Sequence, residues 1–144
     1  MRALKYAWAA PYTAAGLLLG FFGLLLGGKW RLARGALEFS GGVLGRAWSR
    51  LPQPLGFSAM TLGHVILAVD DAALAELRPH EHVHVRQYER WGPLFLPAYL
   101  LSSLMQLLRS RNPYRENHFE RQAYAVGPVR RRADPHRDPI TERV

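Results

Sequence analysis

The chain has no cysteine among its 144 residues. This absence excludes disulfide bonds, cysteine-ligated zinc, iron–sulfur clusters and a cysteine nucleophile. A bound metal must therefore be held by histidine and carboxylate side chains. Acidic residues are also scarce, with 11 Asp and Glu against 19 Lys and Arg, which gives a formal net charge of +8. The length suits one compact domain rather than two.

Charge is absent from a long run near the N-terminus, from Tyr6 to Gly28. The run can cross a bilayer core of about 30 Å at about 1.5 Å per residue. We therefore predict that residues 1–30 are a membrane anchor that crosses the lipid bilayer once. More Lys and Arg follow the run than precede it, which favours a cytoplasmic domain after it. The alternative is a buried hydrophobic hairpin broken at Pro11 or at the glycines.

Glycines recur at a four-residue spacing within the run, as Gly16 with Gly20 and Gly23 with Gly27. This spacing permits close contact between two helices. A partner helix in the membrane is therefore a further expectation.

The segment after the run predicts a small β-sheet. Residues 36–44 and 57–69 are rich in β-forming side chains, and Gly63 is a weak point that makes the second stretch a strand or a hairpin. Prolines and a glycine within residues 46–56 predict a loop between them.

Helices are predicted in the second half of the domain. Asp70 and Asp71 supply an N-cap. Pro79 should interrupt the helix or restart it, and the new helix then runs to Trp91. Residues 117–126 predict a second short helix.

The last segment, residues 127–144, is rich in Pro and Arg and has few apolar side chains to bury. It predicts a disordered basic tail. Its arginines are offset by Asp134, Asp138 and Glu142, so we expect no specific binding to nucleic acid.

The motif that carries chemistry is H-E-x-x-H, from His80 to His84. On a helix, residues four apart share one face, so both histidines can bind one metal ion. Glu81 follows the first ligand, where its carboxylate can reach a metal-bound water and act as general base. The pattern predicts a Zn²⁺ site that hydrolyses a peptide or protein substrate. In an extended chain His82 would instead face the same side as the two ligands.

A catalytic zinc ion needs a third protein ligand and an open position for water. Glu116, His118 and Glu120 are the candidates downstream. Glu116 and Glu120 are four residues apart, so a helix would present both on one face.

The segments HEHVHVRQYERWGPLF and NPYRENHFERQAYA resemble gluzincin-type metallopeptidases, in which a second helix supplies the third ligand. The chain looks most like small bacterial membrane-associated proteins with the same arrangement, over about residues 60–126. The resemblance implies that Glu120 is the third metal ligand, with Glu116 as the fallback. Tyr124 stands where many gluzincins have an acidic residue that orients a histidine.

His64 precedes the motif on the predicted strand and is a second candidate catalytic residue. In zincins an edge strand borders the cleft, and His64 would there face the metal-bound water or steady an oxyanion. Four tyrosines are further candidates to donate to an oxyanion: Tyr88, Tyr99, Tyr114 and Tyr124.

The uncharged stretch 91–108 is just long enough to span a membrane. A single crossing would separate His84 from Glu120 by about 30 Å, so the two residues could not bind one ion. We therefore expect this stretch to pack in the core or to lie along the membrane.

The fold expected from these features is α+β, with an N-terminal transmembrane helix, a small β-sheet and a minimal zincin-like helix pair over residues 31–126. The expected function is that of a membrane-anchored zinc-dependent metallopeptidase. The alternative is a non-catalytic zinc-binding membrane protein with a structural or partner-binding role.

Overall fold

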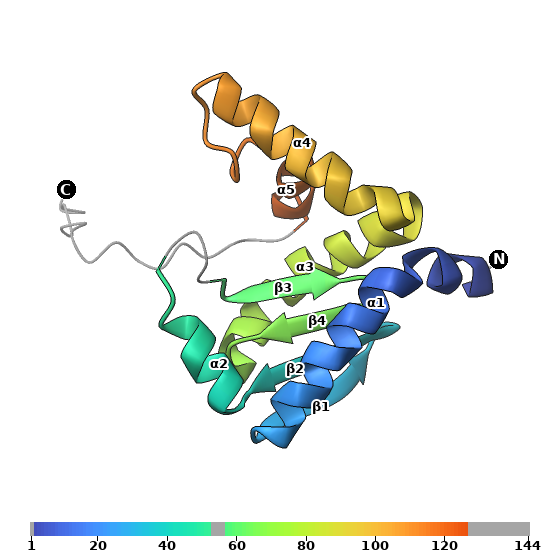
Figure 1. Ribbon diagram of the computed structural model, residues 1–144, viewed down its shortest axis with the longest axis vertical. Helices are drawn as coiled ribbons and strands as arrows, with labels where there is room; N and C mark the ends of the chain where they lie inside the picture. Colours follow the sequence, from blue (N-terminus) through green and yellow to red (C-terminus); the bar gives the residue numbers. More distant parts are fainter. Residues whose placement is uncertain (1, 53–56, 127–144) are drawn as a thin grey trace, which may run out of the picture.

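The computed structural model describes residues 2–52 and 57–126, so the predicted tail, 127–144, lies outside the described residues. The fold is mixed α+β, as predicted, with an apolar N-terminal helix and a four-stranded sheet (Figure 1). The elements in chain order are α1 (Arg2–Leu25), β1 (Gly28–Ala33), β2 (Ala36–Gly41), α2 (Gly42–Ser49), β3 (Ala59–Leu62), β4 (Val65–Ala68), α3 (Asp71–Trp91), the short 3₁₀ helix η1 (Gly92–Leu94), α4 (Phe95–Leu108) and α5 (His118–Tyr124).

The sheet has the strand order β1-β2-β4-β3. Strand β2 is antiparallel to β1 and parallel to β4, while β3 and β4 form an antiparallel hairpin. Residues 57–69, for which a strand or a hairpin was predicted, therefore form a hairpin, and it turns at Gly63, whose φ of +61° favours glycine. Strand β3 lies at an edge of the sheet.

The strand predicted over residues 36–44 ends earlier than expected, at Gly41, and the loop predicted over 46–56 is wrong in its first part. Helix α2 begins at Gly42 and continues to Ser49. Gly41 and Gly42 both have positive φ and turn the chain out of the sheet. The Val43 N–H then donates to the Leu26 carbonyl, which satisfies a backbone group at the start of the new helix.

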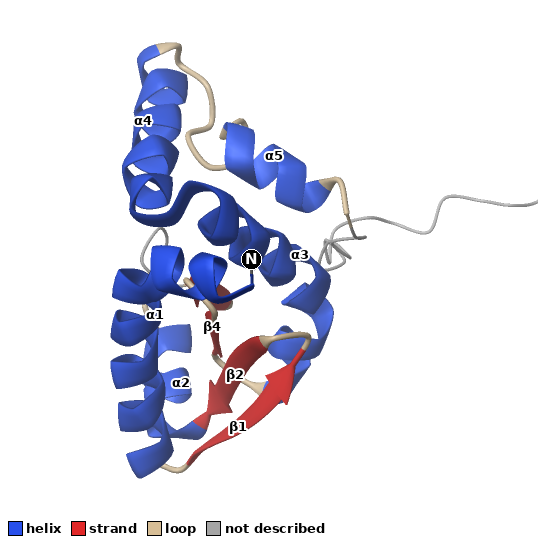
Figure 2. Cartoon of the chain, turned by 90° about the vertical axis from the view of Figure 1, so that its right-hand side faces the viewer, coloured by secondary structure: helices blue, strands red, loops and turns tan. Residues whose placement is uncertain are grey.

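Helices α1 and α3 cover opposite faces of the sheet (Figure 2). Alternation along β4 explains the two layers, because successive side chains of a strand point to opposite faces. Val65 and Leu67 pack with Phe39 and with Leu24 of α1. Between them, Ile66 points the other way and packs with residues of α3.

Helix α3 is continuous across Pro79, so the predicted interruption is wrong. The predicted cap is confirmed, since the Asp70 side chain accepts a hydrogen bond from the Ala73 N–H. A proline inside a helix costs about 3 kcal/mol. Contacts on either side of Pro79 offset this cost, because Arg78 and His82 both bind the buried carboxylate of Glu38 on β2.

Two helical stretches, Leu4–Leu25 and Asp71–Leu108, are long and apolar enough to cross a membrane by length and composition alone. Helix α1 also packs closely on the sheet. A Cβ at Gly16 would lie 2.7 Å from Val65 Cβ and 3.1 Å from the Leu62 carbonyl oxygen, and one at Gly20 would meet the Phe39 ring. Of the four glycines predicted to pack against a membrane helix, Gly16 and Gly20 therefore pack against strands of the same chain.

Substitution of Gly16 by alanine is expected to destabilise the protein, because the added methyl group overlaps Val65. Overpacking of this kind lowers the free energy of unfolding by about 1–3 kcal/mol. Gly23→Ala is the matched control on the same helix. Its Cβ would meet only Leu44, at 3.6 Å, so stability should be unchanged or rise by up to about 1 kcal/mol. Urea unfolding measures both variants. Equal stabilities would show that α1 does not pack on the sheet in solution.

Candidate metal centre

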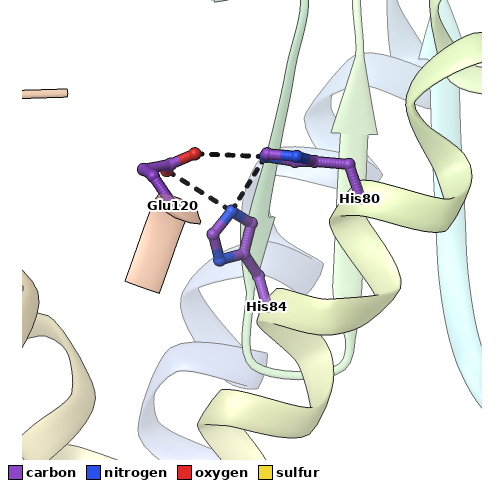
Figure 3. A group of neighbouring side chains, drawn as sticks. All are labelled: His80, His84 and Glu120. Atoms are coloured by element: carbon purple, nitrogen blue, oxygen red, sulfur yellow. Dashed lines mark hydrogen bonds and ion pairs between the residues drawn. The ribbon is translucent and has the colours of Figure 1, made fainter. Parts of the chain in front are cut away.

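His80 and His84 project from one face of α3, one helical turn apart, as the sequence predicts (Figure 3). Their Nε2 atoms lie 3.1 Å from each other, and both side chains are buried. The two rings meet nearly edge to face, with an interplanar angle of 76°. The nitrogen lone pairs can therefore converge on one point between α3 and α5.

Glu120 on α5 completes the group from the opposite side (Figure 3). Its Oε2 lies 3.2 Å from His80 Nε2, and its Oε1 lies 3.4 Å from His84 Nε2. Ligand atoms at about 2.0–2.1 Å from a tetrahedral ion are about 3.3 Å apart. The distance between the two Nε2 atoms, 3.1 Å, is close to such a separation, and each Nε2 has a Glu120 oxygen within 3.4 Å, so this buried group could hold a metal ion.

The start and docking of α5 select Glu120 over Glu116. The Asn117 side chain caps α5 by accepting from the Phe119 N–H, and it donates to the Tyr99 carbonyl and to Ser103 on α4. These bonds place Glu120 in the first turn of α5, facing α3. Glu116 precedes the cap and is exposed, so the fallback ligand is not part of the group.

Gln87 orients His84 from the same helix. The Gln87 Oε1 lies 2.8 Å from His84 Nδ1, and the Gln87 Nε2 donates to the Phe119 carbonyl and to Gln122. The amide oxygen therefore accepts a hydrogen bond from the Nδ1–H, which leaves the Nε2 lone pair of His84 free for a cation. The same side chain ties α5 to α3.

Electrostatics in the group suit a cation. Burial by itself would raise the pKa of the Glu120 carboxyl, but interactions with His80 and His84 outweigh it and lower that pKa to about 2. Burial opposes protonation of His84, yet the neighbouring Glu120 raises the pKa of its imidazole. The buried Glu120 Oε2 still accepts no hydrogen bond. Buried polar atoms normally have partners, and a metal ion would supply one here.

Glu81 lies beside the group, as expected of a general base. Its carboxylate accepts a 2.7 Å hydrogen bond from the Thr61 hydroxyl of the edge strand β3. Burial raises the pKa of the Glu81 carboxyl, and the nearby His84 and the Thr61 hydrogen bond offset this only in part. A carboxylate with a raised pKa is better matched to accepting a proton near neutral pH.

His82 points away from the group. Its Nε2 lies 3.4 Å from the Glu38 carboxylate on β2, on the sheet side of α3. The extended geometry, in which three alternating histidines share one side, is therefore wrong, because residues 80–84 are helical.

His64 lies in a different cluster. Its Nδ1 is 3.5 Å from the Thr13 hydroxyl and its Nε2 is 3.4 Å from Glu89, and Tyr6 stacks on its ring. Both ring nitrogens therefore face α1 and the end of α3, and the structure does not bring His64 to the three candidate ligands. Its contacts link α1 to the sheet and to α3.

Two tyrosines contact the candidate ligands directly. The Tyr99 hydroxyl donates to Glu120 Oε1 at 2.7 Å, and the Tyr124 ring lies 4.7 Å from the His80 ring. Burial raises the pKa of Tyr99, so its hydroxyl stays a donor at neutral pH. Tyr99 thus fixes Glu120, whereas Tyr88 belongs to the apolar core formed with α1 and α4.

Two partners of the group were not anticipated from sequence. Gln87 lies three residues after His84 on the same helical face, and that spacing could have identified it. Thr61 carries no such signal, because its contact with Glu81 depends on how β3 lies against α3.

Comparison of the chain with protein-family models, with curated proteins and with solved structures finds no match.

Proposed function

We propose that the protein is a zinc-dependent metallopeptidase that hydrolyses peptide bonds. The observation that carries this proposal is the convergence of His80, His84 and Glu120 beside a buried Glu81. Two imidazoles and one carboxylate are a ligand set typical of catalytic zinc. The three-ligand count matters, because a structural zinc site closes with four protein ligands.

The chemistry follows from the neighbours of the open position. A bound zinc ion would lower the pKa of a water molecule and polarise the scissile carbonyl. Glu81 would accept the proton of that water and pass it to the leaving amine. Thr61 holds the carboxylate in place for this transfer, and Tyr99 together with Gln87 keeps two ligands oriented.

Strand β3 gives the substrate a place to bind. It is an edge strand whose Thr61 touches the proposed base. An extended peptide can pair with such an edge through main-chain hydrogen bonds. A peptide on β3 would have its carbonyl groups close to Glu81, so we expect an extended peptide or an unfolded protein segment as substrate.

A non-catalytic zinc domain is the second candidate function. Near-complete burial of the three ligands favours it, because a metallopeptidase must admit its substrate to the ion. In this role the ion would bind α5 to α3 and stabilise the fold. Turnover by the zinc-loaded protein distinguishes the two functions.

Association with a membrane is part of the proposal, because α1 is apolar enough to enter one. The sequence predicts a single crossing with the catalytic domain on the cytoplasmic side. Such a crossing requires α1 to leave the sheet, since its midpoint packs on β4 and β2.

Zinc removal is the test of the proposed function. The full-length protein loaded with Zn²⁺ is expected to cleave members of a peptide library, as read by mass spectrometry. A zinc chelator should abolish cleavage, and added Zn²⁺ should restore it, because the ion activates the attacking water. A protein that binds zinc stoichiometrically but cleaves no peptide would support the non-catalytic role. Cleavage that persists after the metal is removed would exclude both the zinc-dependent peptidase and the non-catalytic zinc domain.

A further inference from the structure

The outer face of α1 is apolar but packs against nothing in the described part of the chain. Its inner stripe, with Ala9, Gly16 and Gly20, is buried against the sheet and its neighbours. The rest of the helix surface is as apolar as the stripe, yet it is open, with Leu18 at 73% and Phe21 at 61% exposure. A helix that is apolar all round normally has partners on every side.

Helix α4 likewise has one face packed against the protein and one apolar face that is exposed. Its inner face carries Tyr99, Ser102 and Ser103, which bind Glu120, the His118 N–H and Asn117 of the α5 region. Its outer face is a helical stripe of large apolar side chains, all exposed. They are Leu100, Leu101, Leu104, Met105 and Leu108.

The outer faces of α1 and α4 point in the same direction. In Figure 2, α1 and α4 both lie along the left edge, with the sheet to the right of α1 and α5 to the right of α4. Figure 1 agrees, since both helices lie on the side that faces the viewer. The exposed side chains of both helices therefore form one side of the molecule, which we call the apolar side.

Charge around the apolar side is positive. Neither α1 nor α4 contains an acidic residue, and α4 contains no charged residue. Arg109 and Arg111 follow α4, and both are exposed. An apolar surface with cations at its edge complements an anionic lipid surface, in which the apolar side chains enter the acyl region and the cations meet phosphates.

A crossing by α1 conflicts with its packing. The middle of the helix touches β2 and β4 at Gly20 and Gly16, so a crossing would carry the sheet into the hydrocarbon. The open edges of β1 and β3 would then leave backbone groups without partners, which lipid does not permit. A helix that lies in the plane of the membrane keeps both its packing and its lipid contact.

We propose that the apolar side is a lipid-binding surface, on which α1 and α4 lie flat in the interface of an anionic bilayer while α1 stays packed on the sheet. The protein is then attached to one leaflet and does not cross the membrane. This inference does not depend on the zinc site.

Vesicle binding tests the surface. The full-length protein should bind vesicles of phosphatidylcholine mixed with phosphatidylglycerol, and Phe21→Glu should weaken binding by about tenfold or more. Val126→Glu is the matched control, because Val126 is also exposed and follows α5, the helix that lies on the inner side of α4 in Figure 2. Circular dichroism checks that each variant folds. Equal binding by the two variants, or no binding by the wild type, overturns the proposal. So does a dimer that Phe21→Glu dissociates while vesicle binding stays unchanged.

Cysteine labelling separates lying flat from crossing. The chain has no cysteine, so each introduced thiol is unique. Leu4→Cys and Leu25→Cys mark the two ends of α1, and both positions are exposed. In sealed membrane vesicles, a membrane-impermeant maleimide should reach both ends from the same side, and Leu18→Cys should react about tenfold more slowly. Labelling of the two ends from opposite sides would show a crossing and overturn the proposal.

Discussion

Glu81→Gln is expected to lower the rate of peptide cleavage by about a thousandfold and to leave zinc binding unchanged. General-base catalysis contributes about 10²–10⁴ in rate. The amide keeps the size of the side chain and can still accept the hydrogen bond from Thr61, but it cannot take a proton from water. Because Glu81 is not among the three converging ligands, the zinc content should match that of the wild type.

Glu76→Gln is the control for this change, since Glu76 is exposed on the same helix. It should leave both cleavage and zinc content as in the wild type. Cleavage rates come from the peptides that the zinc-loaded wild type cuts, and zinc content comes from elemental analysis. A Glu81→Gln protein that retains full turnover would remove Glu81 from the mechanism. One that loses zinc as well would make Glu81 a structural support of the site.

Glu120→Ala is expected to weaken zinc binding by about 100- to 1000-fold. Binding of structural zinc is worth about 10–16 kcal/mol over four ligands, so the loss of one ligand costs about 3–4 kcal/mol. Glu120 also carries the negative charge that balances the ion and lies within 3.4 Å of both histidines. Glu120→Gln keeps the shape of the side chain, so a similar loss in that variant would exclude misfolding as the cause.

Glu116→Ala is the matched control for Glu120→Ala. It removes the same charge four residues earlier in the chain, from an exposed position before α5, and zinc affinity should stay within about twofold of the wild type. Competition with a fluorescent zinc indicator measures all the affinities. If Glu116→Ala weakened binding and Glu120→Ala did not, the carboxylate ligand would have been misassigned.

Features that depend on local geometry were predictable from the sequence. The helical period puts His80 and His84 on one face whatever the rest of the chain does. The cap by Asp70 and the turn at Gly63 likewise need only their neighbours along the chain. The richness of residues 57–69 in β-forming side chains likewise predicted a strand or a hairpin there.

Features that depend on contacts between distant segments required the tertiary structure. Glu116 and Glu120 are four residues apart, so helical periodicity does not choose between them. The resemblance implied Glu120, and the Asn117 cap with its bonds to α4 explains why that carboxylate reaches the histidines. Pro79 was predicted to break a helix that instead continues, because Glu38 on a distant strand holds both sides of it.

The sequence by itself determined that any bound metal would have to be held by histidine and carboxylate, and that two candidate ligands would lie one turn apart on a helix. The tertiary structure decided how Glu120 reaches the two histidines, the placement of His64 beside Glu89, and the burial of one side of α1. The physical reason is the distance along the chain over which each interaction acts. Backbone periodicity acts over a few residues, whereas the packing of α1 and α5 depends on surfaces that the sheet and α3 present only once folded.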